Sequence, residues 1–280
     1  MRSEDDKKYL ANKHKGGTAN SKGLLYEDYY AVLQIASCVA YHFKDCNSIS
    51  FQTQLEDAYV DDLLIKYPNI NVYHQLKNSK HLSWETKFSK RTIASDFEKQ
   101  IEECEERKEN FSLKLVHSSL NSKVENSIPK SISKYTITQY FPSYDDINSM
   151  VLSDENFQLV LTTLSANGKE SKNDELCIIA TIILGAWKAL PNRNSLCLLD
   201  IVRKAEEVKH FNLSFYPPKG ISDECAKILN AVEGLDFHIR GRMLYWKLGT
   251  VTGCCPWNED KERMVIEKHP STKLDFLMIF

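Results

Sequence analysis

The stretch that decides the fold of this 280-residue chain is VDDLLIKYPNINVYHQLK, residues 60–77. It contains two apolar, strand-like runs, 60–67 and 70–76, joined by Pro68-Asn69. A joint this tight predicts neighbouring antiparallel strands. Two carboxylates open the first run, and a glutamine and a lysine close the second. The hairpin therefore brings polar groups from both strands to one end.

These polar groups have a chemical logic. Gln75 and Lys77 are two residues apart and therefore point to the same face of their strand. Carboxylate and amide oxygens bind a hard divalent cation such as Mg²⁺, while a lysine orients or deprotonates the attacking water and offsets charge on a phosphate. The pattern favours phosphodiester hydrolysis, with Asp62 and Gln75 as metal ligands and Lys77 as the catalytic lysine. Asp61 is the alternative ligand, because neighbouring aspartates cannot share one strand face.

The flanking sequence predicts a mixed α/β unit around this hairpin. Apolar residues at helical spacing indicate a helix from Gly23 to about Phe43, and a further strand is expected at 48–55. A second helix at 92–108 and a strand at 111–117 follow. The predicted order is helix-strand-strand-strand-helix-strand. Glu27 lies on the leading helix, one turn past its glycine-rich entry, where it could complete the shell of a metal directly or through water.

The remainder of the chain is predicted to be mostly helical and to end in strands. Helices are expected at 145–150, 154–164, 175–190 and 196–208, with another opened by Ser222-Asp223-Glu224. Strands are expected within 237–246 and at 274–280. The predicted organisation is a flexible basic arm (1–22), an α/β domain (23–120), a Ser/Asn/Lys-rich linker (121–134) and a helical and strand domain for regulation or assembly (135–280).

The order of these motifs resembles the PD-(D/E)xK nuclease superfamily, whose core is restriction-endonuclease-like. Within it, the chain is similar to the double-stranded DNA endonuclease domain of bacterial anti-phage systems, found in CBASS effectors and in the nuclease subunit of Lamassu. The resemblance covers about residues 16–118. It rests on Gly23-Leu24-Leu25-Tyr26-Glu27, the 56–62 stretch, His74-Gln75-Leu76-Lys77-Asn78-Ser79 and Trp84. Gln75 stands where the commonest form of the family has a glutamate.

The resemblance implies Mg²⁺-dependent cleavage of double-stranded DNA, with Mn²⁺ as a substitute, held in check until infection is sensed. Asp62, Gln75, Lys77 and Glu27 would form the catalytic set. The implied partners are DNA and the regulatory proteins of a defence complex, an SMC-like ATPase subunit among the candidates. Self-association through the C-terminal domain is the other route to control that we expect.

Composition narrows how DNA could be held. The chain has 36 basic and 38 acidic residues, which leaves a formal charge of −2 and excludes a uniformly basic DNA binder. Contact with phosphates must be local, and we predict it at Lys80, Lys87, Lys90 and Arg91. The N-terminus lacks the apolar stretch of a secretory signal, and the most apolar run, 176–187, is shorter than the roughly 20 residues that span a bilayer. We therefore expect a cytoplasmic protein with no membrane partner.

Structural roles compete with the functional ones. Asp61-Asp62 would also suit a solvated turn, Glu27 a helix surface, His74 a packed position and Trp84 a core or lid anchor. The basic run around 77–91 would also suit a solvated loop. Two other functions remain open: a catalytically silent subunit that binds DNA or scaffolds a complex, and a structure-specific repair nuclease.

Overall fold

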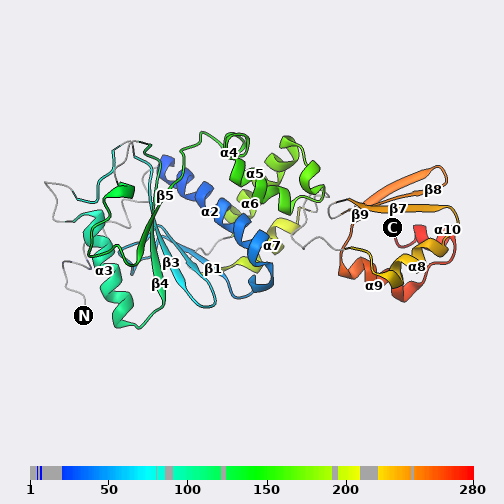
Figure 1. The fold of residues 1–280 in the computed structure, drawn as a ribbon, viewed down its shortest axis with the longest axis horizontal. Coiled ribbons are helices and arrows are strands. Elements are labelled where there is room, and N and C mark those ends of the chain that lie inside the picture. Colours follow the sequence, from blue (N-terminus) through cyan, green and yellow to red (C-terminus); the bar gives the residue numbers. More distant parts are fainter. Residues whose placement is uncertain are drawn as a thin grey trace. The chain divides into compact units, whose positions relative to one another are not determined.

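The computed structural model describes residues 5, 7, 21–79, 81–85, 91–120, 124–190, 195–208, 220–240 and 243–280. They form a mixed α/β structure with a six-stranded mixed sheet and a three-stranded antiparallel sheet (Figure 1). The chain divides into two compact units. The first contains the described residues of Met1–Ile35, Lys44–Ile147 and Ile183–Lys204, and the second those of Ala36–Phe43, Asn148–Ile182 and Ala205–Phe280. None of the points at which the chain passes from one unit to the other falls within residues 121–134.

The first unit has the element order predicted for residues 23–118. Its elements there are α2 (Ser21–His42), β1 (Ser50–Thr53), β2 (Leu63–Lys66), β3 (Asn71–Lys77), α3 (Ile93–Glu106) and β4 (Phe111–His117). The short helices η1 (Phe43–Asp45) and η2 (Val124–Asn126) lie between or after them. Two strands that the sequence pattern does not predict, β5 (Thr136–Tyr140) and β6 (Leu196–Cys197), complete the sheet in the order β5-β4-β3-β2-β1-β6.

The sheet is antiparallel on one side of β3 and parallel on the other. β1, β2 and β3 are antiparallel neighbours, as the tight joints predict, and Leu63 pairs with His74. β4 is parallel to β3 because α3 carries the chain back over the sheet, and β5 is parallel to β4. The C-terminal ends of the parallel strands β3, β4 and β5 therefore lie side by side along one edge of the sheet.

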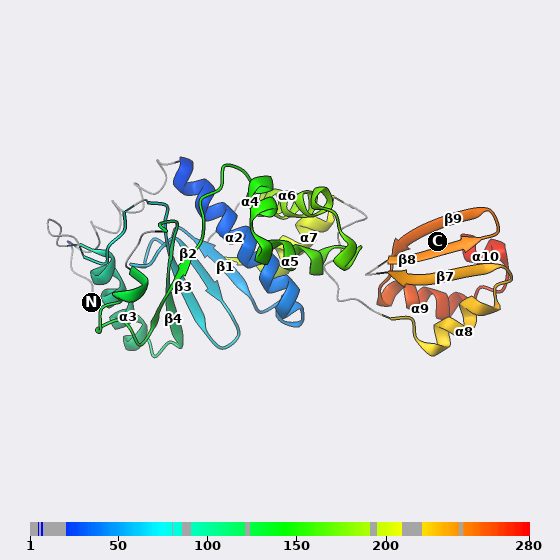
Figure 2. The ribbon, with the colours of Figure 1, turned by 45° about the horizontal axis from the view of Figure 1, so that its top comes forward.

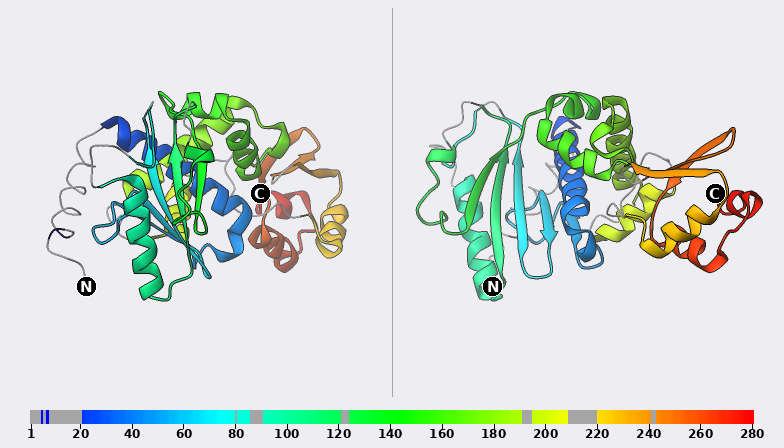
Figure 3. Two further views of the ribbon diagram at one scale, coloured as in Figure 1. Left: turned by 60° about the vertical axis from the view of Figure 1, so that its left-hand side comes forward. Right: turned by 45° about the vertical axis from the view of Figure 1, so that its right-hand side comes forward.

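Helices α2 and α3 lie on opposite faces of this sheet (Figure 3). Residues 73 and 74 alternate between the faces. Tyr73 belongs to the core that packs against Phe97 of α3, whereas His74 contacts the ring of Tyr30 on α2. Thr92 begins α3 with a capping box, which fixes the entry of that helix.

The helical region that follows matches the prediction closely. It contains α4 (Ile147–Ser153), α5 (Glu155–Leu164), η3 (Gly168–Glu170), α6 (Asn173–Ala189) and α7 (Leu198–Glu206). The division between the units passes through α2, α4, α6 and α7, so these helices are shared by both. Among the helices that the structure describes, none has the combined length and apolarity needed to cross a bilayer.

The last part of the second unit is a small α/β module with its own apolar core. β7 (Leu235–Arg240), β8 (Met243–Leu248) and β9 (Val251–Pro256) form an antiparallel meander. α8 (Asp223–Ala231), α9 (Glu259–Lys268) and α10 (Lys273–Leu277) cover one face of it (Figure 2). Ser222 caps α8, as predicted.

The strand predicted at 274–280 is wrong. This segment begins with α10, because Thr272 and Asp275 form a capping box and their side chains satisfy the first backbone N–H groups of the helix. Phe276 is fully buried and packs edge-on against Trp246 of β8. The apolar residues at 274–280 therefore reflect a short helix on the module's core.

One glycine is required for the module to close. Gly253 of β9 pairs with Trp246 of β8, and the indole lies over the glycine. A Cβ at position 253 would lie 2.3 Å from Cζ2 and 2.6 Å from Cε2 of Trp246. No real Cβ is that close to a ring carbon, so a side chain at 253 must displace the indole from the core.

We predict that Gly253→Ala destabilises the C-terminal module by about 1–3 kcal/mol, since overpacking forces buried side chains from their positions. Urea denaturation followed by tryptophan fluorescence measures the change. Gly220→Ala is the matched control, because nothing lies within 4 Å of a Cβ there. Its effect should stay within about 0.5 kcal/mol. Equal stability of the two variants would contradict the indole's placement over Gly253.

Candidate active site

The candidate site is built around the carboxylate of Asp62, one residue before β2. Asp62 is 9% exposed. Its Oδ2 accepts a hydrogen bond from the backbone N–H of Leu76 at 2.6 Å and another from the side-chain amide of Gln75. Both donors belong to β3, since continuing the β2–β3 register one position past Leu63 and His74 sets Asp62 opposite Gln75. The antiparallel pairing itself therefore delivers the carboxylate to β3.

The connection that leads into Asp62 is held by α3. Gln100 is fully buried, and its side-chain oxygen accepts hydrogen bonds from the backbone N–H groups of Tyr59 and Val60, at 2.9 and 3.2 Å. The backbone N–H of Leu55 donates to the carbonyl of Asp61 at 3.0 Å. These bonds satisfy buried backbone groups in a segment that has no ladder of its own. They fix the chain immediately before the site.

Lys77 supplies the positive charge. Its Nζ lies 3.6 Å from Oδ2 of Asp62, and its side chain is 34% exposed. Gln75 and Lys77 lie on the same face of β3, as their spacing predicts, but Gln75 is buried beneath while Lys77 reaches solvent. The ammonium group can therefore contact both Asp62 and a molecule arriving from outside.

Glu27 of α2 completes the group. Burial, and then the neighbouring Asp62 carboxylate, raise the pKa of Glu27 to about 8, while Lys77 and a hydrogen bond from Gln54 act in the opposite direction. The Gln54 amide donates to Oε2 of Glu27 at 2.9 Å, from a backbone position with φ of 53°. Glu27 and Asp62 are thus close enough to repel each other in a poorly solvated place.

This arrangement fits a hard divalent cation. A cation between the two carboxylates would offset their mutual repulsion. The Gln75 amide offers a third oxygen once its terminal group is rotated by half a turn, which exchanges the positions of its oxygen and nitrogen. These two atoms are told apart only by their hydrogen-bond partners. In the parts of the chain that the structure describes, no three His, Cys, Asp or Glu side chains gather as a metal-binding group. A cation here would depend on the amide as its third protein ligand.

Other residues singled out in the sequence take up varied places. Asp61 is buried, and the contacts to Gln75, Leu76 and Lys77 belong to Asp62. Of the predicted phosphate contacts, Arg91 is half-buried just before α3, and Lys80, Lys87 and Lys90 lie outside the described residues.

Two further residues have structural roles. Trp84 is a core anchor: its indole N–H donates to the carbonyl of Val124 at 2.8 Å, and its ring packs on Phe97. His74 is a packed histidine: burial lowers its pKa to about 3, and its Nδ1 lies 3.2 Å from the Leu63 carbonyl oxygen. The structural alternative therefore describes both residues.

Three residues near the site carry no signal in the sequence. Gln54 and Gln100 act through contacts distant in the chain, and polar side chains of this kind are unremarkable in a sequence. His117, in register with Lys77 on β4, is 1% exposed. Neither of its ring nitrogens has a hydrogen bond within the described residues, and Nε2 lies 3.4 Å from a carboxylate oxygen of Glu125.

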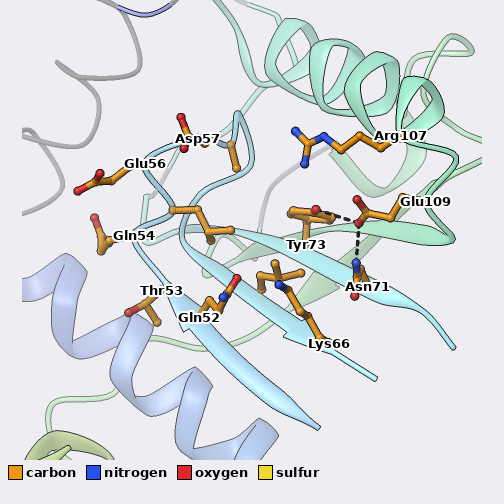
Figure 4. A pocket seen from close by; sticks show the side chains of 13 residues that line it. Gln52, Thr53, Gln54, Glu56, Asp57, Lys66, Asn71, Tyr73, Arg107 and Glu109 are labelled. Carbon is orange, nitrogen blue, oxygen red and sulfur yellow. Dashed lines mark hydrogen bonds between the residues drawn. The ribbon is translucent and has the colours of Figure 1, made fainter. Parts of the chain in front are cut away.

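A cavity of about 360 Å³ lies beside the site, between β1–β3, the 54–58 connection and the end of α3 (Figure 4). Glu109 accepts hydrogen bonds there from Asn71 at 2.7 Å and from Tyr73 at 2.9 Å. Gln54 lines the cavity and also donates to Glu27, so it joins the two places. The charged lining side chains are of both signs: Lys66, Arg107, Glu56, Asp57 and Glu109.

Comparison with known proteins adds no relative. No family model matches the chain, and neither a curated protein nor a solved structure does.

The raised pKa of Glu27 gives a pH-dependent prediction for the metal-free protein. The folded state holds the Glu27 proton more tightly than the unfolded state, so this residue weakens the fold as pH rises from about 4.5 to about 8. Glu27→Gln should leave stability unchanged at pH 4 and raise it by roughly 2 kcal/mol at pH 8.5, discounted for the solvent that reaches the side chain. Urea denaturation with chelator at each pH measures this.

Glu106→Gln is the control for that experiment, because Glu106 is an exposed glutamate at the end of α3. Its difference from the wild type should not change with pH. A Glu27→Gln protein that loses stability at pH 8.5 would show that the carboxylate is not buried beside Asp62.

Proposed function

We propose that this chain is a metal-dependent endonuclease that hydrolyses double-stranded DNA, acting as the effector subunit of a bacterial anti-phage defence complex in the cytoplasm. The proposal includes a restriction-endonuclease-like core formed by α2, β1–β3, α3 and β4. The observation that carries it is the convergence of Glu27 from α2, Asp62 from the position before β2, and Gln75 and Lys77 from β3, at one end of the β2–β3 pair.

The chain's own residues divide the work. Asp62, Glu27 and the Gln75 oxygen would hold the Mg²⁺ ion, which when bound polarises the phosphate and supplies an activated water. The Leu76 N–H fixes the Asp62 carboxylate, so little movement is needed to present its other oxygen. Lys77, partly in solvent, orients the attacking water and offsets the negative charge that develops on the phosphate.

Substrate binding would use the edge where β3, β4 and β5 end together. Ligands of α/β sheets commonly bind outside the carboxyl ends of parallel strands. Exposed polar side chains gather there: Asn78 bonds to Ser143 at 3.1 Å and to Ser118 at 2.8 Å. Such groups suit contacts to a phosphodiester backbone, which position a duplex without reading its sequence.

Control of the activity is assigned to the second unit. A nuclease that cuts without restraint would destroy the DNA of its own host, so we propose that the second unit provides the surface for regulatory partners or for self-association. An assembly that is inactive until triggered agrees with the near-neutral charge of the chain, which gives no general attraction to DNA.

We predict that Lys77→Ala lowers the Mg²⁺-dependent cleavage of plasmid by at least about a hundredfold, since a charge that stabilises the transition state is lost. The full chain, purified with its partners, is incubated with supercoiled DNA, and the loss of intact plasmid is measured on gels. Lys130→Ala, a change at an exposed lysine of the same unit, should cut like the wild type. Chelator should stop all cleavage.

Other outcomes identify the alternatives. If the wild type and Lys77→Ala leave plasmid equally intact with the partners present, the nuclease proposal is overturned. If both proteins then still bind DNA, the chain is a scaffold subunit. Preferential cleavage of nicked or junction substrates over intact duplex would identify a structure-specific repair nuclease. A constitutively active monomer would contradict the proposed control by partners.

A further inference from the structure

A buried carboxylate stands next to Glu27 in the chain and takes no part in the proposed chemistry. Asp28 is 4% exposed. A charge this deeply buried is costly unless it is paired and hydrogen-bonded. Among the described residues, it is bound by two consecutive residues at the end of α6, far away in the sequence.

The two partners hold one oxygen each. The indole N–H of Trp187 donates to Oδ1 of Asp28 at 3.0 Å, and Nζ of Lys188 donates to Oδ2 at 2.5 Å. The indole of Trp187 is a neutral hydrogen-bond donor, whereas the ammonium of Lys188 both donates a hydrogen bond and balances the charge of Asp28. We call these three residues the Asp28 clamp.

The clamp is fixed to the sheet. Trp187 is fully buried, and its ring packs edge-on against Phe51 of β1, with centroids 6.3 Å apart. The segment that follows α6 adds β6 to the edge of β1. The end of α6 therefore has a defined position on the sheet. Because the Asp28 clamp joins α2 to the end of α6, it also fixes the position of α2.

We infer that Asp28 is a positioning residue for Glu27, and that Trp187 and Lys188 hold it in place. Glu27 is the preceding residue of the same helix and lies near Asp62. A shift of α2 at Asp28 therefore moves Glu27 as well. The inference rests on the proposed nuclease function. It makes the end of α6 part of the active-site support.

Asp28 also acts on Glu27 through its charge. The charge of Asp28 is felt at Glu27, where it is one of the groups that raise the pKa of that carboxyl, after burial and Asp62. Lys188 counters this charge, with its ammonium 2.5 Å from Asp28 and its side chain 46% exposed.

The test is Mn²⁺ binding to the full chain, measured by calorimetry without DNA, so that it does not depend on turnover. Lys188→Met should weaken Mn²⁺ binding about tenfold or more, the usual effect of losing a residue that orients a ligand. Lys188→Arg should restore most of the affinity because it keeps the cation. Lys227→Met, the same change on an exposed lysine of α8, should have no effect.

A second comparison separates positioning from general damage. In a Glu27→Gln background, Lys188→Met should cause less than about a twofold further loss of affinity, because the residue through which it acts is already altered. Lys188→Met should unfold at a lower temperature than the wild type, because Asp28 loses its cation, but still in one cooperative transition. Its DNA affinity should match that of the wild type. If Glu27→Gln binds too weakly to titrate, Glu27→Gln and the double variant are compared by the rate of cleavage at one fixed Mn²⁺ concentration below saturation.

The outcomes separate the two claims. The positioning role is overturned if Lys188→Met binds Mn²⁺ as tightly as the wild type. It is also overturned if Lys188→Met loses the same factor of affinity with and without Glu27→Gln. Either result leaves the nuclease proposal standing. A wild-type protein that binds no Mn²⁺ overturns both. Because Lys188 is half-exposed, its variants should fold even if changes at Asp28 do not.

Discussion

The site depends on a single buried carboxylate and on the strand pairing that satisfies it. Asp62 is buried one residue before β2, and β3 donates to it from the Leu76 backbone and from the Gln75 side chain. A slip of one residue between β2 and β3 would turn Gln75 and Lys77 to the α2 face and leave Asp62 without donors. The apolar residues of both strands thus set the register, and the register sets the chemistry.

Much of the first unit follows from local pattern. Apolar periodicity and tight joints predict α2, α3 and β1–β4, because each of these elements buries a face that its own residues define. The convergence of Asp62, Gln75 and Lys77 is predictable too, since a hairpin of known length leaves little choice. The preference for Asp62 over Asp61 follows from its place directly before the apolar strand.

What the sequence does not predict comes from contacts between distant segments. β5 and β6 are short strands whose place depends on a sheet already formed by others. Gln100 and Gln54 support Asp62 and Glu27 from elements far away in the chain. The dense apolar residues at 274–280 predict a strand, but a capping box at Thr272 outweighs that composition. The side-chain hydrogen bonds at the start of α10 therefore determine the structure of this segment.

The discontinuous first unit has a consequence for how the protein is made. A ribosome releases residues up to 147 before it has synthesised 183–204, which contribute β6 and the partners of Asp28. Until then the nascent chain has an unpaired edge at β1 and a carboxylate beside Glu27 without its cation. An exposed strand edge can pair with another chain, so the chain is most exposed to aggregation before residues 183–204 have been made. The same order delays completion of the candidate site until translation has passed residue 188.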